Sequence, residues 1–586
     1  MKQLLNQLPI GGSFLWSDTK PEDVYVCEEF SLEHKMIFNL TKDFVAKEII
    51  PKRAEIESKN HEVVLDIVKK LGDLGLIGTG IPEKYGGSDL DKISTYICAE
   101  NMGKTGSFKV VYGGITGIGT LSVAYFGNEA QKHGIVRELV AGDKVMAFAL
   151  TEPEAGTDAM ALKTTAVLSP DGKKYIINGA KQFITDSAIA DYFCVFCKVD
   201  GKITAIIVEK DTPGFTIGPE EHKMVVRGSS TCPLFFNNVE VPVENVIHGV
   251  GRGHETAFNL LNLGRVTVAT SALGVMKYAL EESARYGNER KQFGVPIASF
   301  GMIKEKLAEM AIKTYVLESA VYRCVGLLDR VFNTMDKTKL GQEIADKLPQ
   351  YALECSITKL FGSEISAGIV DEAVQIHGGY GLIEEYPVEG LYRDARSSRI
   401  LEGTSEVNRI IICKTILRAL KNEELPLRAQ INKLRADLKK REVMVRQDEA
   451  DLVTAAKEAF LLTLSVADEK LGDNLKNTQE ILGRLTNIAM EVFAMDSTLV
   501  RTQKVRAMAG ENKAELKAMM AKAYLNSAMP VLEKNAAEVM AAICETEEAI
   551  ENINVIKNIL QHVPQNVMAL RTEIAKVVSS EEKYPV

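Results

Sequence analysis

The sequence lacks the features that mark secreted, membrane-spanning or disulfide-stabilised proteins. No window approaches the ~20 consecutive apolar residues that a membrane-spanning helix needs. The N-terminal stretch MKQLLNQLPIGGSFLWSDTK has neither the apolar core of a signal peptide nor the Arg and Ser richness of a transit peptide. The nine cysteines follow no disulfide framework, which fits a reducing compartment. We therefore expect a cytoplasmic protein, at most peripheral to the inner face of a membrane.

Excess positive charge and metal-ligand clusters are missing too. Lys and Arg number 70 against 79 Asp and Glu, and the resulting net charge of −9 argues against general nucleic-acid binding. Cys194-x-x-Cys197 could be a redox or metal pair, but no second pair or histidine lies near it in the sequence. It stands in the strand-like run 192–197, so core packing is the favoured interpretation. The sequence predicts no metal site.

What the sequence does contain is enough chain for several hydrophobic cores. Its 586 residues exceed what one core holds, and 46% hydrophobic and 25% charged residues are typical of a globular protein. Helical periodicity gives way to short alternating runs with Asp-Gly turns at about Met146, and helix returns after Ile247. We expect a mainly α protein with a small β domain. Its domains would be 30–145 (helical), 146–250 (a β barrel or sandwich), 251–425 (a helical bundle) and 426–586 (an additional helical domain).

Local signals refine this division. Ser31 is an N-cap candidate, but His34 stands where a capping box has Glu or Gln, so a Ser cap alone is expected. Two short strands, Leu234–Phe236 and Val239–Val241, are expected to finish the β domain. The charged run Arg428–Arg446 predicts a solvated connecting helix before the last domain.

Part of the last domain repeats a sequence pattern found earlier in the chain. Residues 303–323 align without gaps to residues 481–501, which lie 178 positions later. Ile, Leu, Ala, Ser and Arg recur in register, and Glu318 corresponds to Asp496. Two amphipathic helices can share a pattern by necessity, but a degenerate duplicate of the helical domain is the favoured interpretation. No Glu-Gly-Thr loop follows Asp448, so the duplicate would be structural rather than catalytic.

The most distinctive stretch is 375–406, QIHGGYGLIEEYPVEGLYRDARSSRILEGTSE. Its glycine cluster could bring main-chain N–H groups to a phosphate. It closes on Glu402-Gly403 just before an apolar-periodic helix, whose N-cap would be Thr404 or Ser405. A carboxylate at such a junction can project into a cleft as a general base, although most acids at helix starts only favour the helix dipole.

A second stretch points in the same direction. Residues 149–158, ALTEPEAGTD, resemble the TEP-x-AG-[ST]-D signature of acyl-CoA dehydrogenases. The stretch 375–406 resembles the second signature of that family, with Glu-Gly-Thr at its catalytic position. The resemblance runs from about residue 30 to 420 and is closest to the long- and very-long-chain branch, whose members carry a C-terminal extension. It implies an N-terminal helical domain, a middle β domain and a C-terminal helical bundle.

The resemblance also implies a reaction. Members of the family use FAD to remove two hydrogens from a fatty acyl-CoA during fatty acid β-oxidation, which gives the trans-2-enoyl-CoA, and pass electrons to an electron-transferring flavoprotein. Glu402 matches the base that takes the α-proton, and burial would raise the pKa of its carboxyl towards the operating pH. The β-hydrogen leaves as hydride to the flavin. The thioester oxygen is expected to accept from the main-chain N–H of the base and from a flavin hydroxyl.

The family pattern further implies binding positions. Those for FAD are Phe148, Thr151, Thr157, Phe183, Ile184, Thr185, Arg290, Phe293, Phe300, Gln375, Gly378, Gly379, Thr404 and Glu406. Those for the acyl-CoA are Thr157, Asn262, Arg265, Gly403, Gly114 and Gly117. Phe183 stands where many relatives have Trp, so the stacking surface is smaller but still aromatic. Arg290 and Phe293 are expected to reach the flavin of a neighbouring subunit, which implies a homodimer.

Substrate length and assembly follow from two further observations. Gly114 and Gly117 lie on one helical face, where two missing side chains would leave a channel for a long acyl tail; close helix packing is the alternative. A duplicated helical domain would cover the face that tetrameric relatives bury against a second dimer. A competing use of its apolar residues, Leu452-Val453 and 460–462, is attachment to a membrane surface.

Two rival functions share much of this pattern. An acyl-CoA oxidase uses the same base and flavin but is reoxidised by O₂. A non-catalytic assembly or scaffold protein could keep the fold without the chemistry, although an intact Glu402 and both signatures count against it.

Overall fold

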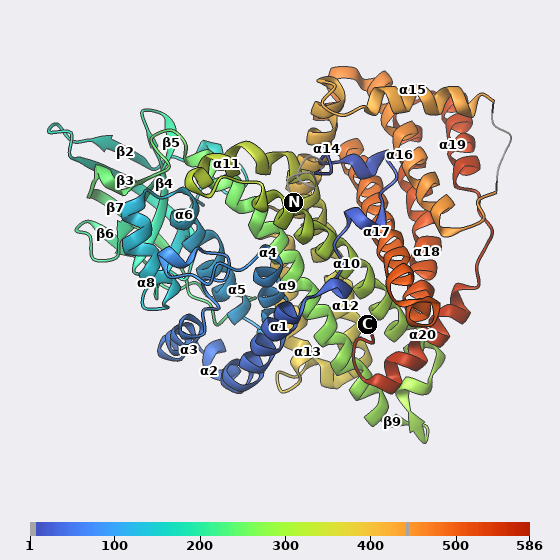
Figure 1. Ribbon diagram of the computed structural model, residues 1–586, viewed down its shortest axis with the longest axis horizontal. Helices are drawn as coiled ribbons and strands as arrows, with labels where there is room; N and C mark the ends of the chain where they lie inside the picture. The colour runs from blue at the N-terminus through green and yellow to red at the C-terminus, as the bar shows by residue number, and fades with distance from the viewer. Residues whose placement is uncertain (1–7, 441–444) are drawn as a thin grey trace.

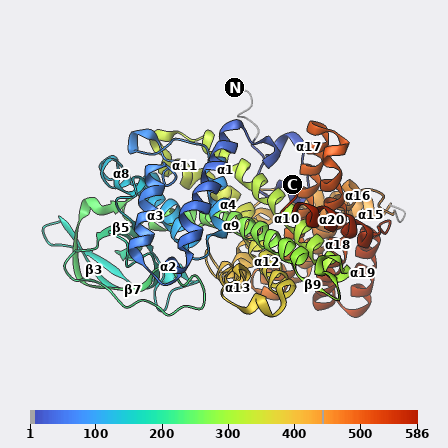
Figure 2. The ribbon, with the colours of Figure 1, turned by 90° about the horizontal axis from the view of Figure 1, so that it is seen from below.

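The structure, a computed structural model, describes residues 8–440 and 445–586. Helices dominate, and one small sheet lies at one end of the molecule (Figure 1). Long central helices separate this sheet from a second group of helices formed by the last part of the chain, as the view from below also shows (Figure 2). The predicted fold class, mainly α with a small β domain and an extra C-terminal helical domain, is therefore confirmed.

The N-terminal helices lie beside the sheet. They are α1 (Leu32–Phe44), α2 (Arg53–Glu57), α3 (His61–Asp73), α4 (Lys92–Met102), α5 (Phe108–Gly113), α6 (Gly119–Phe126), α7 (Glu129–Gln131) and α8 (Arg137–Val140). Ser31 Oγ accepts from the N–H of His34 at 3.1 Å, and the N–H of Ser31 donates to His34 Nδ1 at 3.2 Å. The expectation of a lone Ser cap is wrong, because an imidazole nitrogen accepts the bond that Glu or Gln usually accepts.

The glycine-rich link between α5 and α6 packs directly on the sheet. Gly114–Ile118 forms one π turn, inside which Gly117 leaves helical geometry (φ −108°, ψ −117°). A methyl group on Gly119 would lie 2.2 Å from the carbonyl oxygen of Met146 in the first strand. Only glycine permits this approach, so the link is held against the β domain.

The β domain is a single eight-stranded sheet. Its strands are β1 (Met146–Ala149), β2 (Thr165–Leu168), β3 (Lys174–Thr185), β4 (Tyr192–Val199), β5 (Lys202–Glu209), β6 (Phe215–Ile217), β7 (Thr231–Pro242) and β8 (Val246–Ile247). The order is β6-β7-β3-β2-β4-β5-β8, and β1 pairs in parallel with β4. Antiparallel pairing of β2 with β3 and of β4 with β5 confirms that the Asp-Gly turns predicted from the sequence, at Asp171-Gly172 and Asp200-Gly201, join hairpin strands. Cys194 and Cys197 are fully buried in β4, as core packing predicts.

One β prediction is wrong. The strands expected at Leu234–Phe236 and Val239–Val241 are one strand, β7, which pairs along most of β3. Asn238 adopts a positive φ of 50°, and its N–H donates to Asn178 Oδ1 at 2.8 Å across a shift in register. The turn-like pair Asn237-Asn238 therefore forms a β-bulge within one strand instead of a turn between two strands.

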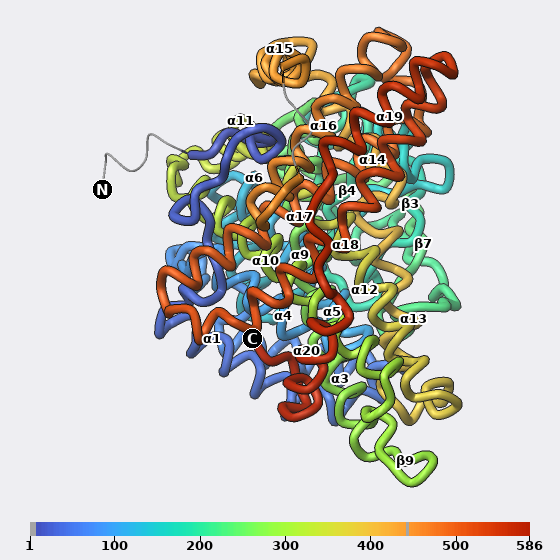
Figure 3. The backbone as a smooth tube through the Cα atoms, turned by 90° about the vertical axis from the view of Figure 1, so that its right-hand side faces the viewer, coloured from blue at the N-terminus to red at the C-terminus, as the bar shows by residue number. Residues whose placement is uncertain are grey.

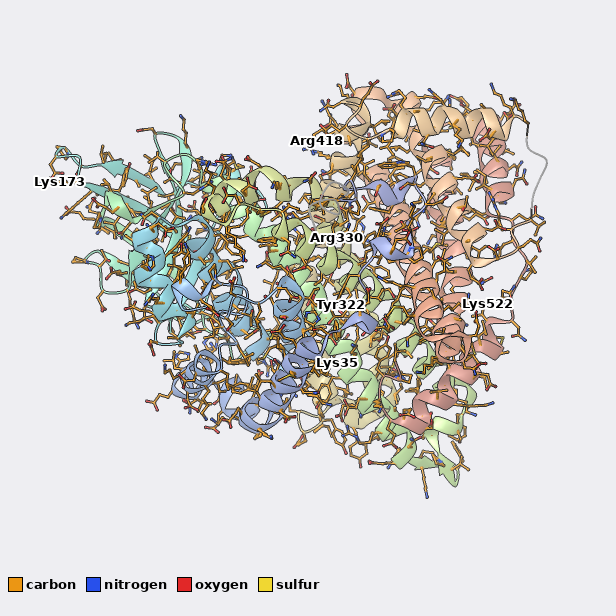
Figure 4. The ribbon with its side chains drawn as sticks, in the orientation of Figure 1. Lys35, Lys173, Tyr322, Arg330, Arg418 and Lys522 are labelled. Atoms are coloured by element: carbon orange, nitrogen blue, oxygen red, sulfur yellow. The ribbon has the colours of Figure 1, made fainter. Side chains whose placement is uncertain are left out.

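The central helices carry the candidate site. They are α9 (Gly253–Glu289), α10 (Gly301–Asn333), α11 (Leu340–Lys347), α12 (Ala352–His377), α13 (Pro387–Ala395) and α14 (Ser405–Lys421). A short hairpin, β9 (Lys291–Gln292) with β10 (Val295–Pro296), joins α9 to α10 and projects away from the sheet (Figure 1). Tyr322 of α10 lies in the middle of the molecule (Figure 4), where its hydroxyl donates to Glu100 at 2.5 Å.

The last helices form the second group seen from the side in Figure 3. They are α15 (Leu427–Leu438), α16 (Glu449–Leu471), α17 (Gln479–Ala509), α18 (Glu511–Ile543), α19 (Thr546–Leu560) and α20 (Val567–Glu581). The predicted connecting helix Arg428–Arg446 is found only in part, as α15, and residues 441–444 lie outside the described residues. Arg446 is not solvated but buried, because its guanidinium pairs with Glu458 and donates to the carbonyl of Ile559.

Membrane attachment through α16 is contradicted. Leu452, Val453 and residues 460–462 are each at most 6% exposed, so they already pack inside the bundle. Within residues 8–440 and 445–586, no helix combines the length and apolar character needed to cross a membrane.

The two similar stretches, residues 303–323 and 481–501, lie in α10 and α17, which pack against each other. Their charged contacts are reciprocal: Arg323 pairs with Asp496 at 2.7 Å, and Arg501 pairs with Glu318 at 2.7 Å. The arginine of each stretch thus pairs with the acid of the other stretch. We call this contact between α10 and α17 the seam.

Two more contacts at the seam repeat the exchange. Arg323 donates to Ser497 at 3.1 Å and lies over the ring of Phe493, while Arg501 donates to Ser319 at 3.3 Å and lies over the ring of Tyr315. The two serines are also 178 residues apart in the sequence, and so are Tyr315 and Phe493. Two copies of one helix related by a two-fold axis would make such contacts, which supports the interpretation of a duplicate.

Candidate active site

The turn before α14 holds Glu402 in an unusual backbone conformation. Glu402 has φ +57° and Gly403 has φ +88°, both in the left-handed region that disfavours a side-chain-bearing residue. Oε2 of Glu402 is buried, and no donor among the described residues hydrogen-bonds to it. Burial raises the pKa of this carboxyl to about 7, although the nearby charges of Arg265 and Lys359 oppose the shift. The turn therefore presents an acid that ionises near neutral pH.

Two predicted residues of α9 lie against this turn. Arg265 Nε donates to the main-chain carbonyl of Glu402 at 3.2 Å, and its Nη1 donates to Asn262 Oδ1 at 2.7 Å. Both side chains are buried, with 7% and 5% of their residues exposed. The structure therefore brings Asn262, Arg265, Glu402 and Gly403 together, which sequence alone could not do because 137 positions separate the arginine from the glutamate.

Sequence reasoning missed two residues that approach this turn from α9 and α12. Gly264 lies so close that a methyl group on it would stand 2.9 Å from Cδ and Oε2 of Glu402. Lys359 of α12 is fully buried and donates to the carbonyl of Gly403 at 2.6 Å. A glycine inside a long helix often marks a close approach, so the sequence could have indicated Gly264. No pattern in the sequence indicates Lys359.

The glycine cluster at the end of α12 lines a pocket. The pocket has a volume of about 480 Å³ and is formed by residues of α9, the hairpin region and the segment after α12, including Arg290, Tyr286, Gly378, Gly379 and Tyr380. Arg290 lies over the ring of Tyr380 at 5.6 Å. A methyl group on either glycine would meet no atom within 4 Å, so their main-chain faces are open. Predicted residues of two separate stretches thus share one pocket.

The β domain gathers another part of the predicted set. Gln182 N–H donates to the carbonyl of Thr151 at 2.9 Å, which ties the first signature to β3. Buried Glu152 pairs with buried Lys181 at 2.8 Å and fixes the same contact. At the end of β3, Phe183 has φ +57° and is 62% exposed, so its ring stands out from the sheet.

The remaining FAD positions are placed as follows. Phe148 packs against the ring of Phe196 inside the sheet, and Ile184 is buried beside half-buried Thr185. Thr404 caps α14 by accepting from the N–H of Val407 at 3.3 Å. Phe300 precedes α10 and is half-buried. The exposed positions are Thr157, Gln375 and Glu406.

The hairpin residue Phe293 does not join the others within one chain. It has φ +52° and is 93% exposed. Figure 1 shows the hairpin and the sheet on different sides of the molecule. The positions predicted to hold one FAD therefore fall into two separate groups, one at the sheet and one at the hairpin and pocket.

Gly114 and Gly117 differ in what they face. A methyl group on Gly114 would lie 2.5 Å from Oδ2 of Asp186, whereas one on Gly117 would meet no atom within 4 Å. Asp186 is buried, has φ +63° and leaves Oδ1 without a partner, and burial raises the pKa of its carboxyl well above its ordinary value. The space beside Gly114 is therefore filled, and only Gly117 borders open space.

The fold is a small sheet flanked by helical domains, and a glutamate with a buried carboxylate oxygen precedes one of the central helices. Models of the acyl-CoA dehydrogenase N-terminal, middle and C-terminal domains match residues 31–143, 147–239 and 251–417, and a further acyl-CoA dehydrogenase C-terminal domain model matches residues 455–558. The chain belongs to the acyl-CoA dehydrogenase family.

Individual relatives agree over different lengths. A probable acyl-CoA dehydrogenase of Bacillus subtilis is 41% identical over 98% of both chains. A crystal structure of an acyl-CoA dehydrogenase complexed with FAD from Bacillus anthracis superposes with a TM-score of 0.96 at 41% identity, covering 98% of this chain and 100% of that one. The mitochondrial very long-chain specific acyl-CoA dehydrogenase of Bos taurus is 33% identical over 74% of this chain and 69% of its own.

Proposed function

We propose that the protein is a cytoplasmic, FAD-dependent dehydrogenase of fatty acyl-CoA thioesters. It converts them to trans-2-enoyl-CoA in fatty acid β-oxidation and passes the electrons to an electron-transferring flavoprotein. One observation carries the proposal: Oε2 of Glu402 is buried and unpaired, and the pKa of its carboxyl is about 7. A carboxylate that no protein donor satisfies is suited to take a proton from a substrate carbon near neutral pH.

The residues present fit FAD. The exposed ring of Phe183 offers a stacking surface, and Arg290 stands beside the open main chain of Gly378 and Gly379 in a pocket of about 480 Å³. FAD, when bound, supplies the acceptor for the hydride that leaves the substrate β-carbon. Phe183 and Thr185 would hold its ring system, and Arg290 and the glycines would hold its pyrophosphate.

The chain's own residues perform the other steps. Glu402 removes the α-proton, and its main-chain N–H donates to the thioester oxygen as negative charge develops there. Arg265 fixes the Glu402 carbonyl and therefore aims both the N–H and the carboxylate. The buried position of Oε2 excludes water that would otherwise compete for the proton.

The test starts from the visible spectrum of the purified protein and its bleaching by acyl-CoAs. Glu402→Gln should keep the flavin and the fold but lose nearly all bleaching, since an amide cannot accept the proton. Glu354→Gln is the matched control: Glu354 is also buried with a pKa of about 7, but its Oε1 accepts from Gly12 N–H, so bleaching should persist. Bleaching of the Glu402→Gln protein at a near wild-type rate in a stopped-flow experiment would refute the assignment.

The two alternative functions, an oxidase and a scaffold protein, predict different outcomes with the same purified protein. An acyl-CoA oxidase would bleach equally well but would then consume O₂ and release peroxide in proportion to substrate. A scaffold protein without chemistry would not bleach at all. Turnover that requires an electron-transferring flavoprotein and yields little peroxide supports the proposed acceptor.

We propose long-chain acyl-CoAs as the preferred substrates. The open space at Gly117 supports a channel, and each additional buried CH₂ contributes roughly 0.8 kcal/mol to binding. The kcat/KM should rise from C8 to C16 or C18, and Gly117→Leu should move the optimum to shorter chains. An optimum at C8 or below that this substitution leaves in place would contradict the channel.

We also propose a homodimer. Phe293 exposes 93% of its surface on the hairpin, Leu382 and Ile383 are exposed in the segment after α12, and such apolar surface needs a partner. The seam occupies one face of the central helices within the chain, which supports a dimer over a tetramer. Light scattering should give the mass of two chains, and Phe293→Ser should lower flavin content. A wild-type tetramer would contradict the covering role of the extra domain.

A further inference from the structure

Lys359 is a buried cation to which the proposed chemistry gives no role. It lies in the middle of α12, between buried Thr358 and Leu360, and is itself 0% exposed. Among the described residues, its ammonium makes one hydrogen bond, to the carbonyl of Gly403 at 2.6 Å. Burying an ammonium group is costly unless it is paired, so its placement beside the Glu402 turn calls for a cause.

The turn that Lys359 contacts is held from three sides. Arg265 from α9 donates to the carbonyl of Glu402, Lys359 from α12 to that of Gly403, and Asn408 from α14 to those of Gly403 and Thr404 at 2.8 and 3.1 Å. Three successive carbonyls are thus bound by side chains from three different helices. A left-handed φ at a glutamate persists when the surroundings enforce it, and these bonds do so.

The electrostatics of the turn point to a second role. The charged groups that influence Lys359 are Glu402, Arg265, Glu364 and Glu406, with burial as the largest effect; burial lowers the pKa of Lys359 to about 8. Glu364 is already paired with Arg409 at 2.6 Å, and Glu406 is exposed. The carboxyl of Glu402 responds to Arg265 and Lys359 alone among charged groups. Cys355 is the remaining titratable group near Arg265.

We propose that Lys359 is a positioning residue for Glu402: its ammonium donates to the Gly403 carbonyl, which fixes the turn and holds a positive charge beside the Glu402 residue. Lys359 touches neither substrate nor reacting atoms. It holds the main-chain N–H of Glu402 in the direction of the thioester oxygen and keeps the base available at neutral pH. The inference rests on the proposed function of Glu402 but assigns a new role to α12.

The test compares Lys359→Met, which removes the charge and the hydrogen bond, with Lys359→Arg, which keeps the charge. In single-turnover bleaching by acyl-CoA, we expect Lys359→Met to lower the plateau rate about 10–100-fold and to move the pH midpoint of the rate upward by about one unit. Lys359→Arg should keep the midpoint within about half a unit and recover part of the rate. Lys421→Met, which removes a lysine that is 72% exposed, serves as the control and should change neither quantity.

A second readout does not depend on turnover. The infrared carbonyl band of a protonated carboxylic acid, taken as the difference between each protein and its Glu402→Gln counterpart, reports the titration of Glu402 directly. Its midpoint should be higher in Lys359→Met than in the wild type. If Lys359→Met does not fold, Lys359→Gln provides the neutral side chain for both measurements.

The outcomes separate this inference from the proposed function. A wild type that no acyl-CoA bleaches would refute the function, while the infrared titration would still test Lys359. If acyl-CoA bleaches the wild type and the neutral Lys359 variant keeps the same rate and the same pH midpoints, the proposed role of Lys359 is wrong. A neutral variant that loses rate or thermal stability with both midpoints unmoved would overturn it as well, because a merely structural lysine behaves in that way.

Discussion

The protein contains two clusters of buried charge that are built in opposite ways. At the seam, Asp496 accepts from Arg323, Lys457 and Thr19, and the pKa of its carboxyl is lowered despite burial. At the turn before α14, Glu402 keeps an unpaired oxygen, and the pKa of its carboxyl is raised to about 7. Complete pairing makes a buried acid a permanent anion that joins helices. Incomplete pairing leaves it ready to exchange a proton.

The neighbours account for the difference. At the turn, Arg265 donates to the carbonyl of Glu402 and to Asn262, and Lys359 donates to the carbonyl of Gly403. These hydrogen bonds hold the turn instead of neutralising the carboxylate. At the seam, both arginines donate to carboxylates, and the pair of Arg323 with Asp496 has a counterpart in the pair of Arg501 with Glu318. The same residue types therefore produce a structural contact in one place and a reactive group in the other.

The largest effect is expected from breaking the seam. Asp496→Asn leaves Arg323 and Lys457 buried without a counter-charge, which should cost about 3–5 kcal/mol of unfolding free energy. The thermal unfolding midpoint should fall by several degrees. Asp473→Asn is the control: its carboxylate pairs with Lys421 but is 80% exposed, so solvent screening should keep the loss far smaller. Equal shifts in the two variants would show that the reciprocal pairs at the seam add no stability.

Crowding the turn should lower its reactivity while the flavin stays bound. Gly264→Ala places a methyl group 2.9 Å from Cδ of Glu402, so the carboxyl must move. Single-turnover bleaching should fall about 10–100-fold while the flavin spectrum persists. Gly483→Ala in α17 is the control, since its methyl group meets no atom within 4 Å and should stabilise the helix by up to about 1 kcal/mol. Unchanged bleaching in Gly264→Ala would mean that Glu402 tolerates a different position.

The sequence predicts the helical and β regions well, because periodicity and Asp-Gly turns act locally. It also predicts that Glu402 precedes a helix. It cannot predict that Lys359 meets Gly403, since this contact depends on how α12 packs against the turn. Nor does local pattern reveal that Arg446 is buried or that His34 completes a capping box, because each depends on a partner that the usual rule does not include.

The pH dependence of bleaching should distinguish the two clusters without any mutation. The active form of Glu402 is the carboxylate, so the rate should fall about tenfold for each pH unit below the pKa of about 7 and level off above it. The carboxylates of the seam, whose pKa values are lowered, remain ionised throughout this range and should not contribute. A rate that does not change between pH 5.5 and 8 would exclude Glu402 as the titrating base.

The last comparison concerns Glu354, a buried acid intermediate between the two clusters. Its Oε1 accepts from the N–H of Gly12 at 2.6 Å, its Oε2 has no partner, and burial raises the pKa of its carboxyl to about 7. The folded protein therefore binds more protons at this site than the unfolded chain does between the ordinary value of 4.5 and about 7. The stability from this site is present below the unfolded pKa and is lost as the pH rises through the folded one.

Glu354→Gln removes that titration while its amide oxygen can still accept from Gly12. Relative to the wild type, the variant should gain about 2–3 kcal/mol of stability between pH 5 and pH 8, because the pKa of Glu354 is about 7 in the fold and 4.5 in the unfolded chain. Thermal midpoints measured at both pH values provide the comparison, and Asp473→Asn, at an exposed site, should show no such gain. A Glu354→Gln protein whose midpoint differs from the wild type by the same amount at both pH values would show that Glu354 is ionised in the fold. It would then belong with the fully satisfied acids of the seam, not with Glu402.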